Sequence, residues 1–266
     1  MADCDRPAVR VERDGAVASI VLNHPPLNLF GDEVFEALGA CLDEVEGSDA
    51  RAVVWRAEGD DVFTGGADVN VFQRILDDGG EGGTRTFGAL LAPVRRIEAL
   101  PVPTLALVHG LCLTAGLEVS LGCDMIWASE SARFGLVEAV VGLTPGAGGT
   151  QRMAERAGPA RAREFVMSGG IYDAATLERW NVVNRVVPDD DLREKGMRFA
   201  HRLAAGPTKA HGATKRIVRA YLEGGVDRAD EATGEIAGGL FETEDLRSAV
   251  RSFLAEGPGK ATFEGR

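Results

Sequence analysis

Residues 108–152 read VHGLCLTAGLEVSLGCDMIWASESARFGLVEAVVGLTPGAGGTQR, and this stretch decides the fold and carries the candidate chemistry. It holds two carboxylates, Glu118 and Glu138, each in an apolar run and each downstream of glycines that allow close backbone approach. A glutamate near a helix start is often stabilised only by the helix dipole, and this interpretation stays open for Glu118. Glu138 stands between FGLV and AVV, a poor place for a charge unless it is paired or used in chemistry. We therefore interpret the two glutamates as candidate catalytic residues.

The chain on either side of this stretch alternates strand and helix patterns, as expected for an α/β protein. An Asp-Gly pair at residues 14–15 separates two runs rich in β-branched residues, which predicts an antiparallel hairpin. Glycine-rich residues 77–83 are expected to be the most flexible segment. In chain order, the pattern predicts strands at 9–13 and 16–22, a helix at 31–47, a strand at 52–55, a glycine-containing loop at 63–68, a helix at 84–100, a strand at 104–108, a helix from Ala115-Gly116, and a strand at 124–129.

Beyond Gly146 the pattern becomes mainly helical, with one further strand. Helices are expected at 148–156, 159–168 and 173–180, a strand at 182–187, and only helices after Pro188. We place a domain boundary near residue 200, so that residues 1–200 form the α/β core and residues 201–266 a helical region. Apolar stripes within 209–222 and 246–254 predict that this region packs against the core or another subunit.

Four motifs in the chain resemble the enoyl-CoA hydratase (crotonase) family. They are FTGGAD at 63–68, the spacing of Gly110, Gly116, Glu118 and Asp124, the run from Phe134-Gly135 through Glu138 to PGAGGTQR at 145–152, and VVNRVVP at 182–188. The resemblance covers most of the chain. It implies a ClpP-like spiral of repeated ββα units, with a C-terminal helical region through which relatives form trimers, often paired into hexamers.

The resemblance also implies a reaction and a site. Relatives add water to a 2-enoyl-CoA thioester, and the matching residues make Glu118 and Glu138 the catalytic carboxylates. Glu138 then handles the α-carbon proton, and Glu118 helps to hold the water. The other implied residues are the oxyanion-hole N–H donors Ala67 and Ala115, the water-positioning Gly146, and Leu27, Gly66, Asp68, Val69 and Asn70 along the acyl-CoA channel. No metal and no separate cofactor are implied, because coenzyme A is part of the substrate.

The chain departs from the family pattern at two places. Thr114-Ala115-Gly116 stands where relatives commonly have three glycines, and a left-handed backbone at Ala115 would cost about 1–2 kcal/mol. Asn70 stands where relatives often have a lysine that meets the nucleotide phosphates. Arg56 or Lys260 is then the expected substitute.

Composition excludes several other function classes. The 266 residues carry a formal charge of −12, which disfavours nucleic-acid or anionic-membrane binding over the whole surface. The four cysteines lack CxxC spacing, so we expect reduced thiols, and the first seven residues lack a signal-peptide pattern. Because no apolar run approaches the length of a membrane span, we expect a cytoplasmic protein. Dinucleotide, P-loop, HExxH and GxSxG motifs are absent, and the four histidines lack ligand spacing.

Three functions remain open at this point. A hydratase needs both glutamates, and we favour it because both are present. A Δ3,Δ2-enoyl-CoA isomerase needs only the residue matching Glu138, and another crotonase-type acyl-CoA reaction stays open as part of the same alternative. A non-catalytic binding protein, including the RNA-binding role that some relatives have, needs neither glutamate, and the acidic charge disfavours it.

Overall fold

Residues 7–266 are described in this computed structural model. The expectations for the amino-terminal segment and for Cys4 lie outside these residues. The other three cysteines, Cys41, Cys112 and Cys123, are free and buried, as expected.

The larger of two sheets has six strands in the order β1-β2-β3-β5-β7-β10. The hairpin β1–β2 is antiparallel and turns at residues 15–16, as the Asp-Gly pair predicts, and the other pairings are parallel. Side chains of β3 alternate between two apolar clusters, with Val53 and Trp55 in one and Ala52 and Val54 in the other. The sheet is therefore covered on both faces. Its strands are β1 (Val9–Asp14), β2 (Val17–Leu22), β3 (Ala52–Ala57), β5 (Thr104–Val108), β7 (Met125–Ser129) and β10 (Arg185–Val187).

A second sheet of four short strands forms beside the first, in the order β4-β6-β8-β9. Its strands are β4 (Val62–Thr64), β6 (Leu111–Leu113), β8 (Arg133–Gly135) and β9 (Tyr172–Asp173). The expectation that 63–68 is entirely loop was wrong, because Phe63 and Thr64 are fully buried and β4 pairs with β6. The glycine-containing part of that segment follows β4 directly, so this small sheet fixes where the loop begins.

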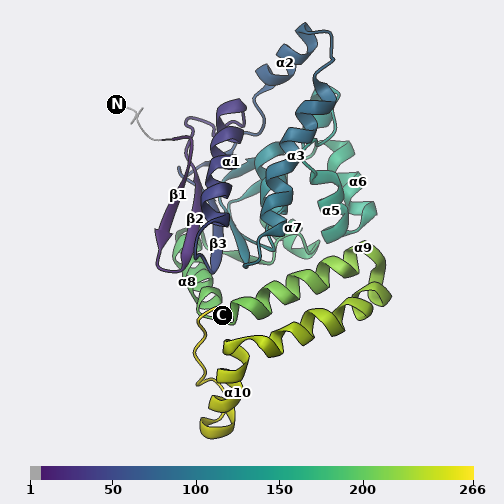
Figure 1. Cartoon of the computed structure of the whole chain (residues 1–266). Coiled ribbons are helices and arrows are strands. Elements are labelled where there is room, and N and C mark those ends of the chain that lie inside the picture. The colour runs from purple at the N-terminus through teal and green to yellow at the C-terminus, as the bar shows by residue number, and fades with distance from the viewer. Residues whose placement is uncertain (1–6) are drawn as a thin grey trace.

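Helices cover the sheets and lie between them (Figure 1). The helices α1 (Asp32–Glu46) and α3 (Gly83–Ala99) pack against each other on one side, and α4 (Thr114–Leu121) is buried along its whole length. A helix that the sequence pattern did not predict, α2 (Val69–Asp77), begins where the Asp68 side chain accepts a hydrogen bond from the N–H of Asn70. The remaining helices before residue 192 are η1 (Glu138–Val141), α5 (Gly149–Ala157), α6 (Pro159–Ser168), α7 (Ala174–Arg179) and η2 (Asp189–Asp191).

From residue 192 to residue 256 the only regular elements are helices, as expected, and residues 257–266 follow without helix or strand. Residue 200, the predicted boundary, lies within α8 (Leu192–Ala204), which packs on β2, β3, β5 and β7. The later helices α9 (Thr208–Gly238), η3 (Gly239–Glu242) and α10 (Glu244–Glu256) extend away from the sheets (Figure 1). The chain reverses within α9 at Gly224 and Gly225, where the backbone is not helical. Within residues 7–266, no helix combines the length and the apolar character needed to cross a membrane.

Candidate active site

Glu118 lies on the buried helix α4 with only 3% of its surface exposed. The N–H groups of Ala147 and Gly149 both donate to its Oε1 atom, at 2.9 and 2.8 Å. Ala147 belongs to the glycine-rich loop that leads into α5, and Gly149 is the first residue of that helix. A Cβ atom at Gly149 would lie 2.8 Å from the Cγ of Glu118, so glycine is required for this close approach.

Burial raises the pKa of Glu118 to about 7, although the two N–H donors and the charge of Arg152 oppose the rise. Arg152 is itself buried, and its Nε donates to Glu98 at 2.7 Å. Its Nη1 donates to the carbonyl of Gly148 at 3.1 Å. Arg152 therefore holds in place the loop that positions Glu118.

Glu138 is the first residue of η1 and is half-buried. Its Oε2 atom is buried and has no hydrogen-bond partner within residues 7–266. Burial, and then the nearby charge of Glu118, raise its pKa to about 7. The charge of Glu118 thus acts on Glu138, so the two carboxylates that the sequence analysis selected lie near each other.

The loop after β4 is tied to the segment around Leu27. The N–H of Gly65 donates to the carbonyl of Leu27 at 2.7 Å, and the N–H of Phe30 donates to the carbonyl of Gly66 at 2.8 Å. The following N–H, that of Ala67, donates to the hydroxyl oxygen of Thr114 at 2.8 Å. The structure therefore brings the two expected oxyanion segments together, at Ala67 and at the head of α4.

The left-handed backbone in this region falls on Thr114 and not on Ala115. Thr114 has φ +43°, whereas Ala115 has no positive φ and is 3% exposed. The conformational cost of a left-handed backbone, which was expected at Ala115, therefore falls on Thr114. For a β-branched residue this cost is about 1–3 kcal/mol. No local sequence signal marks Thr114, because its partner Ala67 lies 47 residues away in the chain.

An aromatic pair lies against the expected water-positioning residue, Gly146. A Cβ atom at Gly146 would overlap the ring of Phe87 on α3. Phe87 stacks on Phe72 of α2, with ring centroids 6.4 Å apart. The unpredicted helix α2 thus packs, through Phe72, against the side chain that contacts Gly146.

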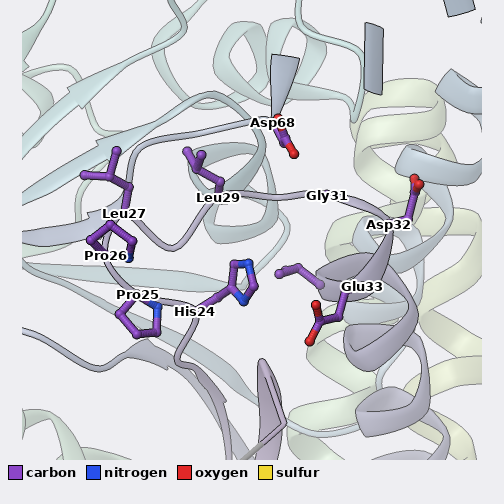
Figure 2. Close-up of a pocket in the computed structure, with 10 residues that line it drawn as sticks. His24, Pro25, Pro26, Leu27, Leu29, Gly31, Asp32, Glu33 and Asp68 are labelled. Atoms are coloured by element: carbon purple, nitrogen blue, oxygen red, sulfur yellow. The ribbon is translucent and has the colours of Figure 1, made fainter. Parts of the chain in front are cut away.

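Two of the residues expected along the acyl-CoA channel, Leu27 and Asp68, line a surface hollow of about 260 Å³ (Figure 2). Figure 2 shows the carboxylates of Asp32, Glu33 and Asp68 around this hollow, together with the ring of His24. The Asp68 carboxylate caps α2 through the N–H of Asn70 at 2.9 Å. The hollow is therefore acidic. The remaining channel residues lie next to it in the chain: Gly66 is buried, and Val69 and Asn70 are exposed.

The expectation that Arg56 could meet the nucleotide phosphates is wrong. Arg56 is 5% exposed and forms ion pairs with Glu12 and Glu58. Because its guanidinium group is paired with these two carboxylates, Arg56 is not free to bind a phosphate. Lys260, the other expected cation, lies exposed in the segment after α10.

The chain is similar over nearly its whole length to one protein family. The family model described as enoyl-CoA hydratase/isomerase matches residues 12–266. The short-chain-enoyl-CoA hydratase of Clostridium acetobutylicum is 30% identical over 249 residues, which cover 92% of this chain and 94% of that protein. The crotonyl-CoA hydratase of Syntrophomonas wolfei is 28% identical, over 95% of this chain and 96% of its own. A crystal structure of an enoyl-CoA hydratase from Bacillus anthracis has a TM-score of 0.88 at 26% identity, over 97% of this chain and 100% of its own.

Proposed function

The chain belongs to the enoyl-CoA hydratase/isomerase family, and from this premise we propose that it adds water reversibly to a 2-enoyl-CoA thioester. The single observation that carries the proposal is the pair Glu118 and Glu138, two coupled carboxylates with pKa values of about 7. A group that titrates near the working pH serves well as a general acid or base. Hydration needs one of each.

In the proposed reaction, the oxygen of water bonds to the β-carbon while a proton goes to the α-carbon. The ionised carboxylate accepts a proton from the water, and the protonated carboxylate supplies the α-proton, so the pair ends with its one proton. Following the family resemblance, Glu138 serves the α-carbon, while Glu118 holds the water together with the N–H of Gly146. Negative charge develops on the thioester oxygen, where preorganised donors in the Ala67 and Ala115 segments stabilise it.

A second candidate, Δ3,Δ2-enoyl-CoA isomerisation, is supported by an asymmetry between the glutamates. Oε1 of Glu118 is anchored by two N–H groups, whereas Oε2 of Glu138 has no hydrogen-bond partner in the part of the chain that the structure describes. An isomerase moves a proton between two carbons of the substrate and needs only one mobile carboxylate. Glu138 fits that description.

A comparison of two substrates separates these functions. Wild type, Glu118→Gln and Glu138→Gln would be assayed with crotonyl-CoA for hydration and with a 3-enoyl-CoA for isomerisation. The hydratase proposal expects each variant to lose at least 10²-fold in hydration, with the double variant far from multiplicative because the residues act as a unit. Negligible hydration by wild type, with isomerisation that survives Glu118→Gln, would replace the hydratase with the isomerase.

We further propose that the protein assembles as a homotrimer or a hexamer through its C-terminal helices. Large apolar side chains are exposed on them, including Phe253 and Leu254 at 58% and 80%. Such exposure on neighbouring turns is typical of an interface. The three free buried thiols support action in a reducing compartment such as the cytoplasm.

A further inference from the structure

The N–H of Ala67 is already engaged in this structure. It donates to Oγ1 of Thr114 at 2.8 Å, and Thr114 immediately precedes Ala115, the other expected donor. A thioester oxygen bound directly to Ala67 would have to compete with that hydroxyl for the same hydrogen. The family arrangement of two main-chain donors therefore does not carry over unchanged to this chain.

The Thr114 hydroxyl has a proton of its own to offer. Its oxygen accepts from Ala67, and no bond from its O–H to another acceptor is found within residues 7–266. Thr114 is 8% exposed, so it lies just below the surface of the site. A hydroxyl that accepts one hydrogen bond is polarised and becomes a stronger donor in the next.

The backbone around this contact is arranged to accommodate the hydroxyl. Thr114 adopts φ +43°, which β-branched residues rarely do, and strain of this kind is concentrated at functional sites. Opposite it, Gly66 has φ +103°, and a Cβ atom there would overlap Oγ1 of Thr114. The threonine side chain thus occupies space that only glycine at position 66 leaves open.

We propose that the Thr114 hydroxyl is a direct donor to the thioester oxygen, with the N–H of Ala115 as the second donor and the N–H of Ala67 as the group that polarises the hydroxyl. This inference rests on the proposed acyl-CoA reaction. Thr114 keeps its proton throughout: as water adds to the β-carbon, charge grows on the oxygen, the hydrogen bond shortens, and the charge returns to the α-carbon as that carbon is protonated. No group is transferred to the threonine.

Substitutions at position 114 test the role of the hydroxyl. Thr114→Val keeps the side-chain shape and removes the hydroxyl, Thr114→Ala removes it with less backbone strain, and Thr114→Ser keeps it. We expect kcat for crotonyl-CoA to fall about 10²-fold or more in the valine and alanine variants, and by less than about fivefold in the serine variant.

A spectroscopic readout separates this role from packing. The enolate of acetoacetyl-CoA absorbs in the near ultraviolet, so its fraction in the bound ligand reports stabilisation of the oxygen at a fixed pH. We expect this fraction to fall in the alanine and valine variants and to be restored in the serine variant. Thermal unfolding of each variant establishes that it is folded.

The outcomes are distinct from those that judge the proposed function. If wild type transforms neither crotonyl-CoA nor a 3-enoyl-CoA, the proposed function fails. If wild type is active and Thr114→Ala matches or exceeds it, the hydroxyl only obstructs the donor and the inference is overturned. Equal losses in the serine and alanine variants also overturn it, because both lose the threonine methyl group and only alanine loses the hydroxyl.

Discussion

Replacing Glu118 by glutamine should stabilise the folded protein above pH 7 while it removes activity. Glutamine has nearly the same shape, and its Oε1 can still accept the hydrogen bonds from Ala147 and Gly149 at 2.9 and 2.8 Å. What the substitution removes is the charge of a side chain that is only 3% exposed. A charge buried with incomplete compensation destabilises the fold.

The pKa of Glu118 gives the size of the effect. It rises from 4.5 to about 7 on folding, and a difference of one in pKa corresponds to about 1.4 kcal/mol. Between pH 4.5 and 7 the folded protein keeps the proton that the unfolded chain loses, so the wild-type free energy of unfolding falls as the pH rises. Above pH 7 the buried charge lowers the wild-type free energy of unfolding by about 3 kcal/mol. Below pH 4.5 the carboxyl group is protonated in both states, and the free energy of unfolding is not lowered. Glutamine does not carry this cost at any pH.

Urea unfolding, followed by the fluorescence of the three tryptophans, measures this difference. At equal protein concentration, the free energies of unfolding of wild type and Glu118→Gln should nearly agree at pH 4.5–5 and differ by about 3 kcal/mol at pH 8. A matched control is Glu223→Gln on α9, which removes an exposed ion pair with Arg219 and should change stability by less than about 0.5 kcal/mol. A glutamine variant less stable than wild type at pH 8, or a difference that does not depend on pH, would refute the reasoning.

Four further outcomes are expected. The pH profile of kcat/KM should be bell-shaped around pH 7, because one of Glu118 and Glu138 must be protonated and the other ionised; a flat profile from pH 5 to 9 would contradict this. Gly146→Ala should lower kcat sharply because its methyl group overlaps Phe87, and adding Phe87→Ala should restore part of the loss; no recovery would mean that the overlap is not the cause. Ala115→Pro, which removes the N–H, should reduce turnover far more than Ala115→Gly, whereas equal losses would indicate packing. Turnover should survive exhaustive chelation, since the proposed reaction uses carboxylates and main-chain donors; loss of turnover would argue for a metal.

Most of the larger sheet could be predicted from sequence, because its strands are long enough to show their pattern. The Asp-Gly pair at 14–15 fixes the hairpin turn, and every residue of β5 after Thr104 is apolar. The helix α2 was missed although Val69, Phe72 and Leu76 recur at helical spacing after the N-cap Asp68; none of its residues is buried in the structure. The strands β4, β6 and β8 have three residues each, too few to show a period of two.

The site could be predicted as a list of residues but not as a set of bonds. Glu118 and Glu138 stand out because they interrupt apolar runs. The donors to Glu118, which are the N–H groups of Ala147 and Gly149, lie 29 and 31 residues away in the chain, and no local sequence pattern predicts these hydrogen bonds. The same holds for Arg56, whose ion pair with Glu12 spans 44 residues and removes it from the list of free cations. Tertiary contacts of this kind depend on how the two sheets are joined.

Main-chain N–H groups make several of the hydrogen bonds in this region, from Ala147 and Gly149 to Glu118 and from Ala67 to Thr114, and this has an evolutionary consequence. Any residue except proline supplies the same main-chain N–H. A mutation at one of these positions therefore changes the size of the side chain beside the donor but keeps the donor itself. Selection then acts on size, as at Gly149, where a methyl group would strike Glu118. Related proteins can therefore diverge far in sequence while they keep the same set of main-chain hydrogen-bond donors. A new side chain at a donor position can reshape which acyl groups fit without dismantling the machinery that would act on them.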